Sequence, residues 1–155
     1  MYDVHERDVP ELLVLTEQRH VPIEELSPWI GAAMNRLCAS AGGYGGVSDP
    51  PFVIFHGEVN EDSDGPVEVC VPIRPDRGHS EESALWREPA HREAYVRIRK
   101  AQVEYPQILS AYDAVHSWIG TEGRTAAGSP REVYFADFDA AGADAEVCDV
   151  AWPIS

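Results

Sequence analysis

The sequence contains an internal repeat, and this repeat limits the folds that the chain can adopt. Each half holds a short apolar segment that begins after a proline, then an acidic loop, then a second apolar segment that ends in Pro-Ile. The leading prolines are Pro51 and Pro130, the closing prolines are Pro72 and Pro153, and both pairs are separated by nearly the same length of chain. We therefore expect two copies of one structural unit, at about 10–73 and 92–154.

The apolar pattern predicts the order strand, helix, strand, strand in the first half. Residues 11–17 are rich in β-forming side chains between turn formers, which indicates a strand. Residues 22–40 place apolar side chains at intervals of three and four, which predicts a helix. The glycine-rich run 42–46 is expected to end this helix and to begin a flexible loop. Strands are expected at 52–56 and 67–72, joined by a turn-like linker at 61–66.

The second half predicts the same order, with a strand at 93–100, a helix at 106–120, and strands at 132–136 and 147–152. Additional strands are expected near 4–8 and 83–87, and residues 74–82 are interpreted as the linker between the halves. The predicted fold is α+β, with tandem strand-helix-strand-strand units forming one antiparallel sheet, two main helices and a groove between the halves. At 155 residues, the chain is expected to form a single domain, 1–155.

Charge and composition exclude several classes of function. The formal net charge of −15 opposes nucleic-acid binding and attracts cations. The sequence has no apolar run of about 18 residues and no secretory signal, so we expect no membrane association and a cytoplasmic location. The three cysteines are expected to be free thiols, and the spacing of the six histidines predicts no metal site. No cofactor is expected, and the oligomeric state stays open.

Glu132 is the strongest candidate functional residue. Counted from the leading prolines, its repeat mate in the first half is Val53. Side chains two apart share one face of a strand, so Glu132 and Tyr134 should correspond to Val53 and Phe55. A carboxylate in a position that the other half fills with a buried valine has to be paired, protonated or functional. Two alternatives stay open: Glu132 faces solvent in a shifted register, or Arg131 or Arg124 neutralises it.

Aromatic residues are concentrated in and around the second half, and their faces can bind cations or stack on flat ligands. Packing within the core is the alternative explanation, and it is preferred for Trp118. The residues expected to bind a ligand are Glu132, Tyr134, Tyr112, Tyr105, Phe55, Trp86 and Trp152.

Residues 92–98, the tyrosine-containing helical segment 105–119, the segment 128–135 with its Glu-x-Tyr motif, and the closing Trp-Pro-Ile resemble the GyrI-like (gyrase-inhibitor-like) small-molecule-binding domains. This family includes the effector-binding modules of AraC- and MerR-type multidrug regulators. The resemblance covers nearly the whole chain and implies the duplicated fold described above. It also implies a groove for bulky, cationic aromatic compounds in which Glu132 corresponds to the buried glutamate and Tyr134 to its aromatic neighbour.

Two functions of different classes follow. The first is binding of bulky hydrophobic, aromatic or cationic small molecules, for multidrug sensing, sequestration, detoxification or resistance. The second is hydrolysis of cyclopropane-bearing genotoxins, which the resemblance implies for some stand-alone relatives. In that reaction Glu132 would act as a general base and a tyrosine such as Tyr134 would polarise a carbonyl group. A weaker alternative is a protein that docks a larger partner through its acidic surface, as a gyrase inhibitor would.

Overall fold

The computed structural model describes residues 2–74 and 85–155, so all of the predicted linker at 74–82 except Arg74 lies outside the described residues. The chain divides into two compact units, of which unit 1 comprises Met1–Val9 with His91–Ser155, and unit 2 comprises Pro10–Ala90. Each unit contains a set of four antiparallel strands and one long helix, and unit 2 also contains a two-stranded hairpin. This mixture confirms the predicted α+β class. The prediction of a single domain over 1–155, with a groove between the halves, stays a prediction.

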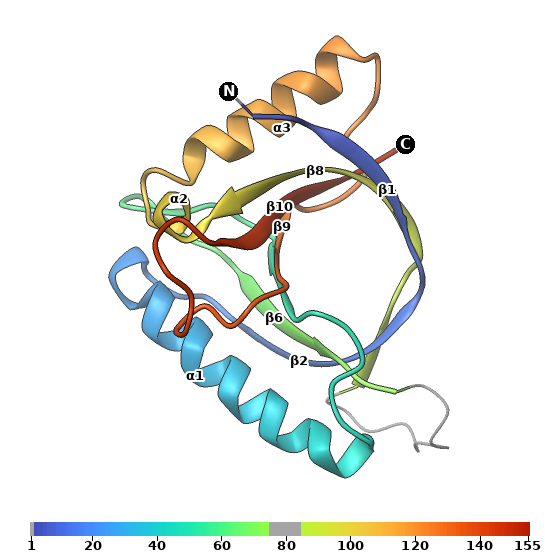
Figure 1. Ribbon diagram of the computed structural model, residues 1–155, viewed down its shortest axis with the longest axis vertical. Coiled ribbons are helices and arrows are strands. Elements are labelled where there is room, and N and C mark those ends of the chain that lie inside the picture. The colour runs from blue at the N-terminus through green and yellow to red at the C-terminus, as the bar shows by residue number, and fades with distance from the viewer. Residues whose placement is uncertain (1, 75–84) are drawn as a thin grey trace. The chain divides into compact units, whose positions relative to one another are not determined.

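Unit 2 has the strand order β3-β6-β2-β7, formed by Phe52–Phe55, Val67–Pro72, Leu12–Arg19 and Leu85–Glu88. Helix α1 (Ile23–Ala41) follows β2 and lies along β2 and β6 (Figure 1). The helix buries one apolar face, as its spacing predicts. The buried members of this face are Trp29, Ala33, Leu37 and Ala41.

Unit 1 has the strand order β1-β8-β10-β9, formed by His5–Val9, His91–Arg99, Glu146–Ile154 and Arg131–Tyr134. Helix α3 (Leu109–Thr121) packs against β8 and β10 (Figure 1). Its side chains Ala111, Val115 and Ile119 join Val96 and Val150 in one buried cluster. In β8, and in β10 from Cys148 onward, the side chains that point to α3 are therefore the even-numbered ones, and their odd-numbered neighbours point to the opposite face of the sheet.

The order strand, helix, strand, strand is the same in both halves, which confirms the predicted duplication. The pairing register agrees with the sequence repeat. Val53 pairs with Val69 in unit 2, and Glu132 pairs with Val150 in unit 1. Glu132 lies two residues after Pro130, as Val53 lies two residues after Pro51. Val150 lies three residues before Pro153, as Val69 lies three residues before Pro72. Equivalent residues of the two repeats therefore pair with equivalent partners.

The two additional strands are present, and each pairs with the first strand of the other repeat. Strand β1 precedes the first repeat but pairs with β8, and β7 precedes the second repeat but pairs with β2. Unit 1 is therefore discontinuous in sequence, because its edge strand comes from the N-terminus.

Three local predictions were incomplete. The first four residues of the linker predicted at 61–66 belong to a small hairpin of β4 (Val59–Asn60) and β5 (Ser63–Asp64). The glycine-rich run after α1 begins with a 3-10 turn, Gly42–Tyr44, which continues the helical backbone. A short helix, α2 (Lys100–Val103), follows β8, and α3 begins only at Leu109 because Tyr105 and Pro106 form a separate turn before it.

We expect Gly57→Ala to destabilise unit 2 by about 1–3 kcal/mol. A methyl group at Gly57 would overlap the Gly65 carbonyl group, whose carbon would lie 2.8 Å away. The control is Gly31→Ala, on α1, where no atom lies within 4 Å and the higher helix propensity of alanine should add about 1 kcal/mol. Denaturant unfolding of both variants tests this prediction, and equal stability of Gly57→Ala and the parent would contradict it.

Within the described part of the chain, none of the helices has the length and apolar character needed to cross a membrane.

Candidate ligand-binding site

Glu132 lies on β9 and points to the face of unit 1 that α3 covers. It pairs with Val150, which belongs to the cluster beneath α3, and only 5% of Glu132 is exposed. The register and burial agree with the repeat, because the mate Val53 is fully buried as well. The alternative in which Glu132 faces solvent is therefore wrong.

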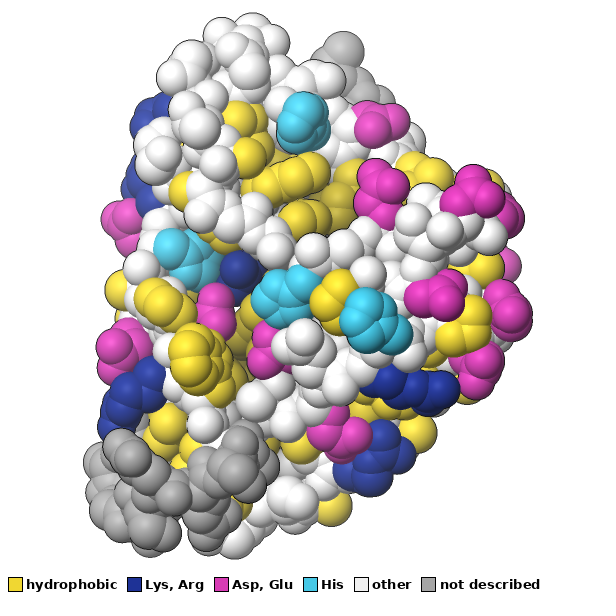
Figure 2. Space-filling view, turned by 180° about the vertical axis from the view of Figure 1, so that it is seen from behind, with side chains coloured by type: hydrophobic (Ala, Val, Ile, Leu, Met, Phe, Trp, Pro, Cys, Tyr) yellow, Lys and Arg dark blue, Asp and Glu magenta, His cyan; other side chains and the backbone are white. Residues whose placement is uncertain are grey.

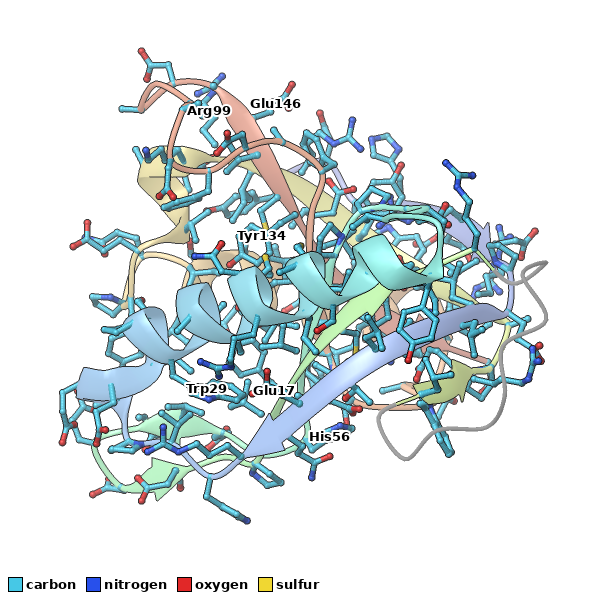
Figure 3. All side chains as sticks on the ribbon, turned by 90° about the horizontal axis from the view of Figure 1, so that it is seen from below. Glu17, Trp29, His56, Arg99, Tyr134 and Glu146 are labelled. Carbon is cyan, nitrogen blue, oxygen red and sulfur yellow. The ribbon has the colours of Figure 1, made fainter. Side chains whose placement is uncertain are left out.

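Two tyrosines hold the Glu132 carboxylate from different elements. The Tyr112 hydroxyl, on α3, donates to Oε2 at 2.6 Å. The Tyr134 hydroxyl, two residues along β9, donates to Oε1 at 2.5 Å. Short hydrogen bonds to an ionised oxygen are stronger than neutral ones, so the two phenols fix the position of the carboxylate (Figure 3 labels Tyr134).

The protonation of this cluster is set mainly by burial. Burial raises the pKa of Glu132, and the hydrogen bonds from Tyr112 and Tyr134 offset part of that rise. Burial, together with the neighbouring carboxylate, raises the pKa values of Tyr112 and Tyr134 well above the ordinary value, so both hydroxyls stay protonated as donors. The pKa of the Cys148 thiol is also raised well above its ordinary value, first by burial and then by Glu132.

Glu132 has no cationic partner among the residues that the structure describes, since none of their salt bridges includes it. Arg124, one of the two predicted neutralising residues, instead pairs with Glu6 at 3.1 Å. Arg131 is the residue before Glu132 on β9, so its side chain leaves the strand on the opposite face. A buried carboxylate without a counter-ion favours a cationic ligand, because the ligand supplies the missing charge.

The raised pKa of Glu132 gives a pH-dependent stability. Below the ordinary pKa of about 4.3, Glu132 is protonated in both the folded and the unfolded chain. As the pH rises, the unfolded chain ionises first, so stability is lost until the pH passes the raised pKa of the folded state. We therefore expect Glu132→Gln to gain stability over the parent across this interval.

Denaturant unfolding of parent and Glu132→Gln from about pH 4 to 8 tests this expectation. The pKa of Glu93 is lowered, so Glu93 gives the opposite dependence of stability on pH. This contribution is the same in the parent and in Glu132→Gln, and it cancels when their stabilities are subtracted. A stability difference that is the same at every pH would show that Glu132 has an ordinary pKa.

Two aromatic contacts extend from the tyrosine pair. Trp152, on β10, meets Tyr112 edge-on at 6.5 Å between ring centroids, and His116, one turn further along α3, lies 5.1 Å from Trp152. Phe138, in the loop after β9, meets Tyr134 edge-on at 6.3 Å. His116 and Phe138 were absent from the predicted set. The i, i+4 spacing of His116 from Tyr112 could have indicated the first, whereas a loop gives no periodic signal for the second.

The predicted ligand-binding residues fall into three groups. The structure brings together Glu132, Tyr134, Tyr112 and Trp152 in unit 1. Tyr105 is half-buried in the turn between α2 and α3. Phe55 and Trp86 belong to unit 2, where Phe55 is half-buried on β3, and Trp86 is 54% exposed with its indole N–H donating to Glu88 at 3.1 Å. A role in ligand binding stays a prediction for all seven residues.

Three other carboxylates differ from Glu132 in their partners or in their burial. Asp149 is fully buried on the opposite face of unit 1, where it accepts hydrogen bonds from Arg7 and Arg97. Glu68 occupies the equivalent position in unit 2 and contacts Thr16 and the His56 ring. Glu104 is exposed, so it lacks the burial that distinguishes Glu132.

Comparisons with known proteins establish the fold. No protein-family model matches the sequence, and no curated protein matches it. Among solved structures, the C-terminal domain of EcmrR has a TM-score of 0.74 at 19% identity, covering 100% of this chain and 98% of that chain. The chain has the GyrI-like fold.

Two further structures with this GyrI-like fold are similar. EcmrR in a complex with DNA has a TM-score of 0.78 at 21% identity over 99% of this chain, which spans 57% of the length of that EcmrR chain. A hydrolase from Listeria innocua has a TM-score of 0.67 at 14% identity, covering 98% of this chain and 91% of that chain. At these identities the likeness establishes the GyrI-like fold and not the function.

Proposed function

We propose that this protein binds bulky aromatic small molecules that carry a positive charge, at the site around Glu132. The observation that supports this function is the buried carboxylate, which two tyrosines position and which no cation neutralises among the described residues. The ligand supplies the opposite charge, and the rings of Tyr112, Tyr134 and Trp152 supply faces on which its flat body stacks.

The charge of the molecule supports the same ligand class. The formal net charge of −15 concentrates cations near the surface at low salt. On the face shown in Figure 2, acidic side chains are scattered widely, and the basic side chains seen there do not merge into one patch. The resemblance to multidrug-binding GyrI-like domains supports it too, so sequestration, detoxification or drug resistance is the expected biological use.

The test of this function compares dyes that share a ring system and differ in charge. A rhodamine ester with a fixed positive charge should bind, and the same ring system in its neutral closed form should bind at least about tenfold more weakly, because it cannot pair with Glu132. Calorimetry measures both affinities, and fluorescence anisotropy gives a second measurement for the charged form, because the closed form is not fluorescent. Equal affinity for the two forms, or no binding of any cation in a panel of dyes, would reject the proposal.

Hydrolysis is the second candidate function, and the paired tyrosines favour it. An ionised carboxylate with a raised pKa is a stronger base toward water, and a phenol beside it is a donor for a developing oxyanion. A hydrolase from Listeria innocua shares the fold.

Mass spectrometry of an activated cyclopropane compound after incubation with the protein tests this function, because hydrolysis adds the mass of one water to the compound. Turnover by the parent that is lost in Glu132→Gln and Tyr134→Phe supports catalysis, and an unchanged compound leaves binding alone.

A further inference from the structure

Phe138 is an exposed aromatic residue that contacts the Glu132 cluster. The side chain is 37% exposed, which is unusual for a large apolar residue in this structure. Its ring meets the Tyr134 ring at 6.3 Å and 83°, and the Tyr134 hydroxyl donates to Glu132. The three side chains therefore form a continuous series from the surface of unit 1 to the buried carboxylate.

The Phe138 ring also has a cation on its face. The Lys100 ammonium group lies 4.8 Å from the ring centroid. The same ammonium donates to the Ala141 carbonyl at 3.1 Å, so the lysine is held where it meets the ring. The ring is thus a cation-binding surface in the protein itself.

Hydrogen bonds fix the loop that carries Phe138. The backbone N–H groups of Lys100 and Ala101, at the start of α2, donate to the carbonyls of Ala145 and Ala143 at 2.9 and 3.0 Å. At the other end of the loop, Asp137 accepts hydrogen bonds from the N–H groups of Asp139 and Ala140. Phe138 is therefore presented in one position before any ligand arrives, which lowers the entropy cost of binding.

We propose that Phe138 is a specificity-determining residue that selects aromatic over aliphatic cations, an inference that rests on the proposed binding at Glu132. Because Glu132 is buried, a bulky ligand cannot lie wholly beside its carboxylate, and the body of the ligand extends outward past Tyr134. The next ring in that direction is Phe138, and an aryl group of the ligand stacks on it. Lys100 competes for the same ring, because its ammonium already lies over one face of it.

Phe135, at the start of the same loop, provides a matched control. Its ring stacks on Arg97 at 4.3 Å, and Arg97 pairs with Asp149 on the face of the sheet opposite to Glu132. Phe135→Leu therefore removes an aromatic ring from the same loop without changing the series that leads to Glu132.

The experiment measures the dissociation constants of tetraphenylphosphonium and tetrabutylphosphonium, which have the same charge and differ in aromatic content. Calorimetry is performed on the full chain and on Phe138→Ala, Phe138→Leu, Phe135→Leu, Lys100→Met and Glu132→Gln. Phe138→Leu keeps apolar packing against Tyr134, so it separates loss of the ring from disturbance of the loop.

The preference for the aryl cation should fall about three- to tenfold in both Phe138 variants and stay unchanged in Phe135→Leu. Lys100→Met should raise the preference about two- to fivefold, because it removes the competing cation.

The outcomes separate the two proposals. An unchanged preference in the Phe138 variants, or an equal fall in Phe135→Leu, would overturn the role of Phe138 even where Glu132→Gln weakens both cations. Equal affinity of the parent and Glu132→Gln for both cations would instead overturn the proposed function at Glu132.

Discussion

Asp149→Ala is expected to destabilise the protein by about 3 kcal/mol, the largest loss that we expect from one side chain. Asp149 is fully buried and accepts hydrogen bonds from Arg97 at 2.8 and 3.0 Å and from Arg7 at 2.8 Å. Without Asp149, the two guanidinium groups keep one carboxylate in this buried network, Glu93, which lies 2.9 Å from Arg7. Both arginines are partly exposed, so water compensates some of the loss and keeps it near the lower end of the range for buried pairs.

The measurement is denaturant unfolding at neutral pH. The matched control is Asp8→Asn, whose carboxylate also pairs with an arginine, Arg92, but is 84% exposed. Water replaces that interaction, so the control should unfold at the same denaturant concentration as the parent. Midpoints that coincide for Asp149→Ala and the parent would mean that the buried network adds nothing to stability.

Glu132→Gln is expected to weaken binding of an aromatic cation about 10- to 100-fold, which is roughly 1.5–3 kcal/mol. Glutamine keeps the shape of the side chain and one acceptor oxygen, so the change removes mainly the charge. The affinity of the parent for a permanently charged cation should also rise with pH, because the raised pKa of Glu132 leaves part of the carboxylate protonated at acidic pH. The affinity of Glu132→Gln should stay constant over the same pH range.

The control for this prediction is Glu146→Gln, which changes the net charge by the same amount at an exposed position of unit 1. A loss of affinity that is equal in the two variants would indicate general attraction to an acidic surface. Unchanged affinity in Glu132→Gln would place the anchor on another residue.

The repeat was the most informative part of the sequence, because it predicted both element order and register. The matching positions of the prolines in the two halves place Glu132 against Val150 as they place Val53 against Val69. The comparison of repeat mates also predicted the burial of Glu132, because a strand position that is buried in one copy is expected to be buried in the other. No local pattern was needed for that step.

Features that depend on contacts between distant segments were not predictable in this way. Nothing in the sequence of β1 indicates that it pairs with β8, because strand propensity does not specify a partner. Phe138 was missed because its position depends on loop hydrogen bonds and not on a repeating pattern. The start of the second long helix was placed at Pro106 and not at Leu109, because apolar spacing does not distinguish a turn from the helix that follows it.

The pairing of β1 with β8 has a consequence for synthesis on the ribosome. Unit 2 is one continuous segment, Pro10–Ala90, so all of its strands are available before the second repeat has been translated. Strand β1 emerges before unit 2 but acquires its partner only after β8 has been made, and β10 follows later still. During that interval His5–Val9 is a nascent segment with an unpaired backbone, which a chaperone can cover or another chain can capture. The charged side chains Glu6, Arg7 and Asp8 within it oppose such capture until the second repeat is complete.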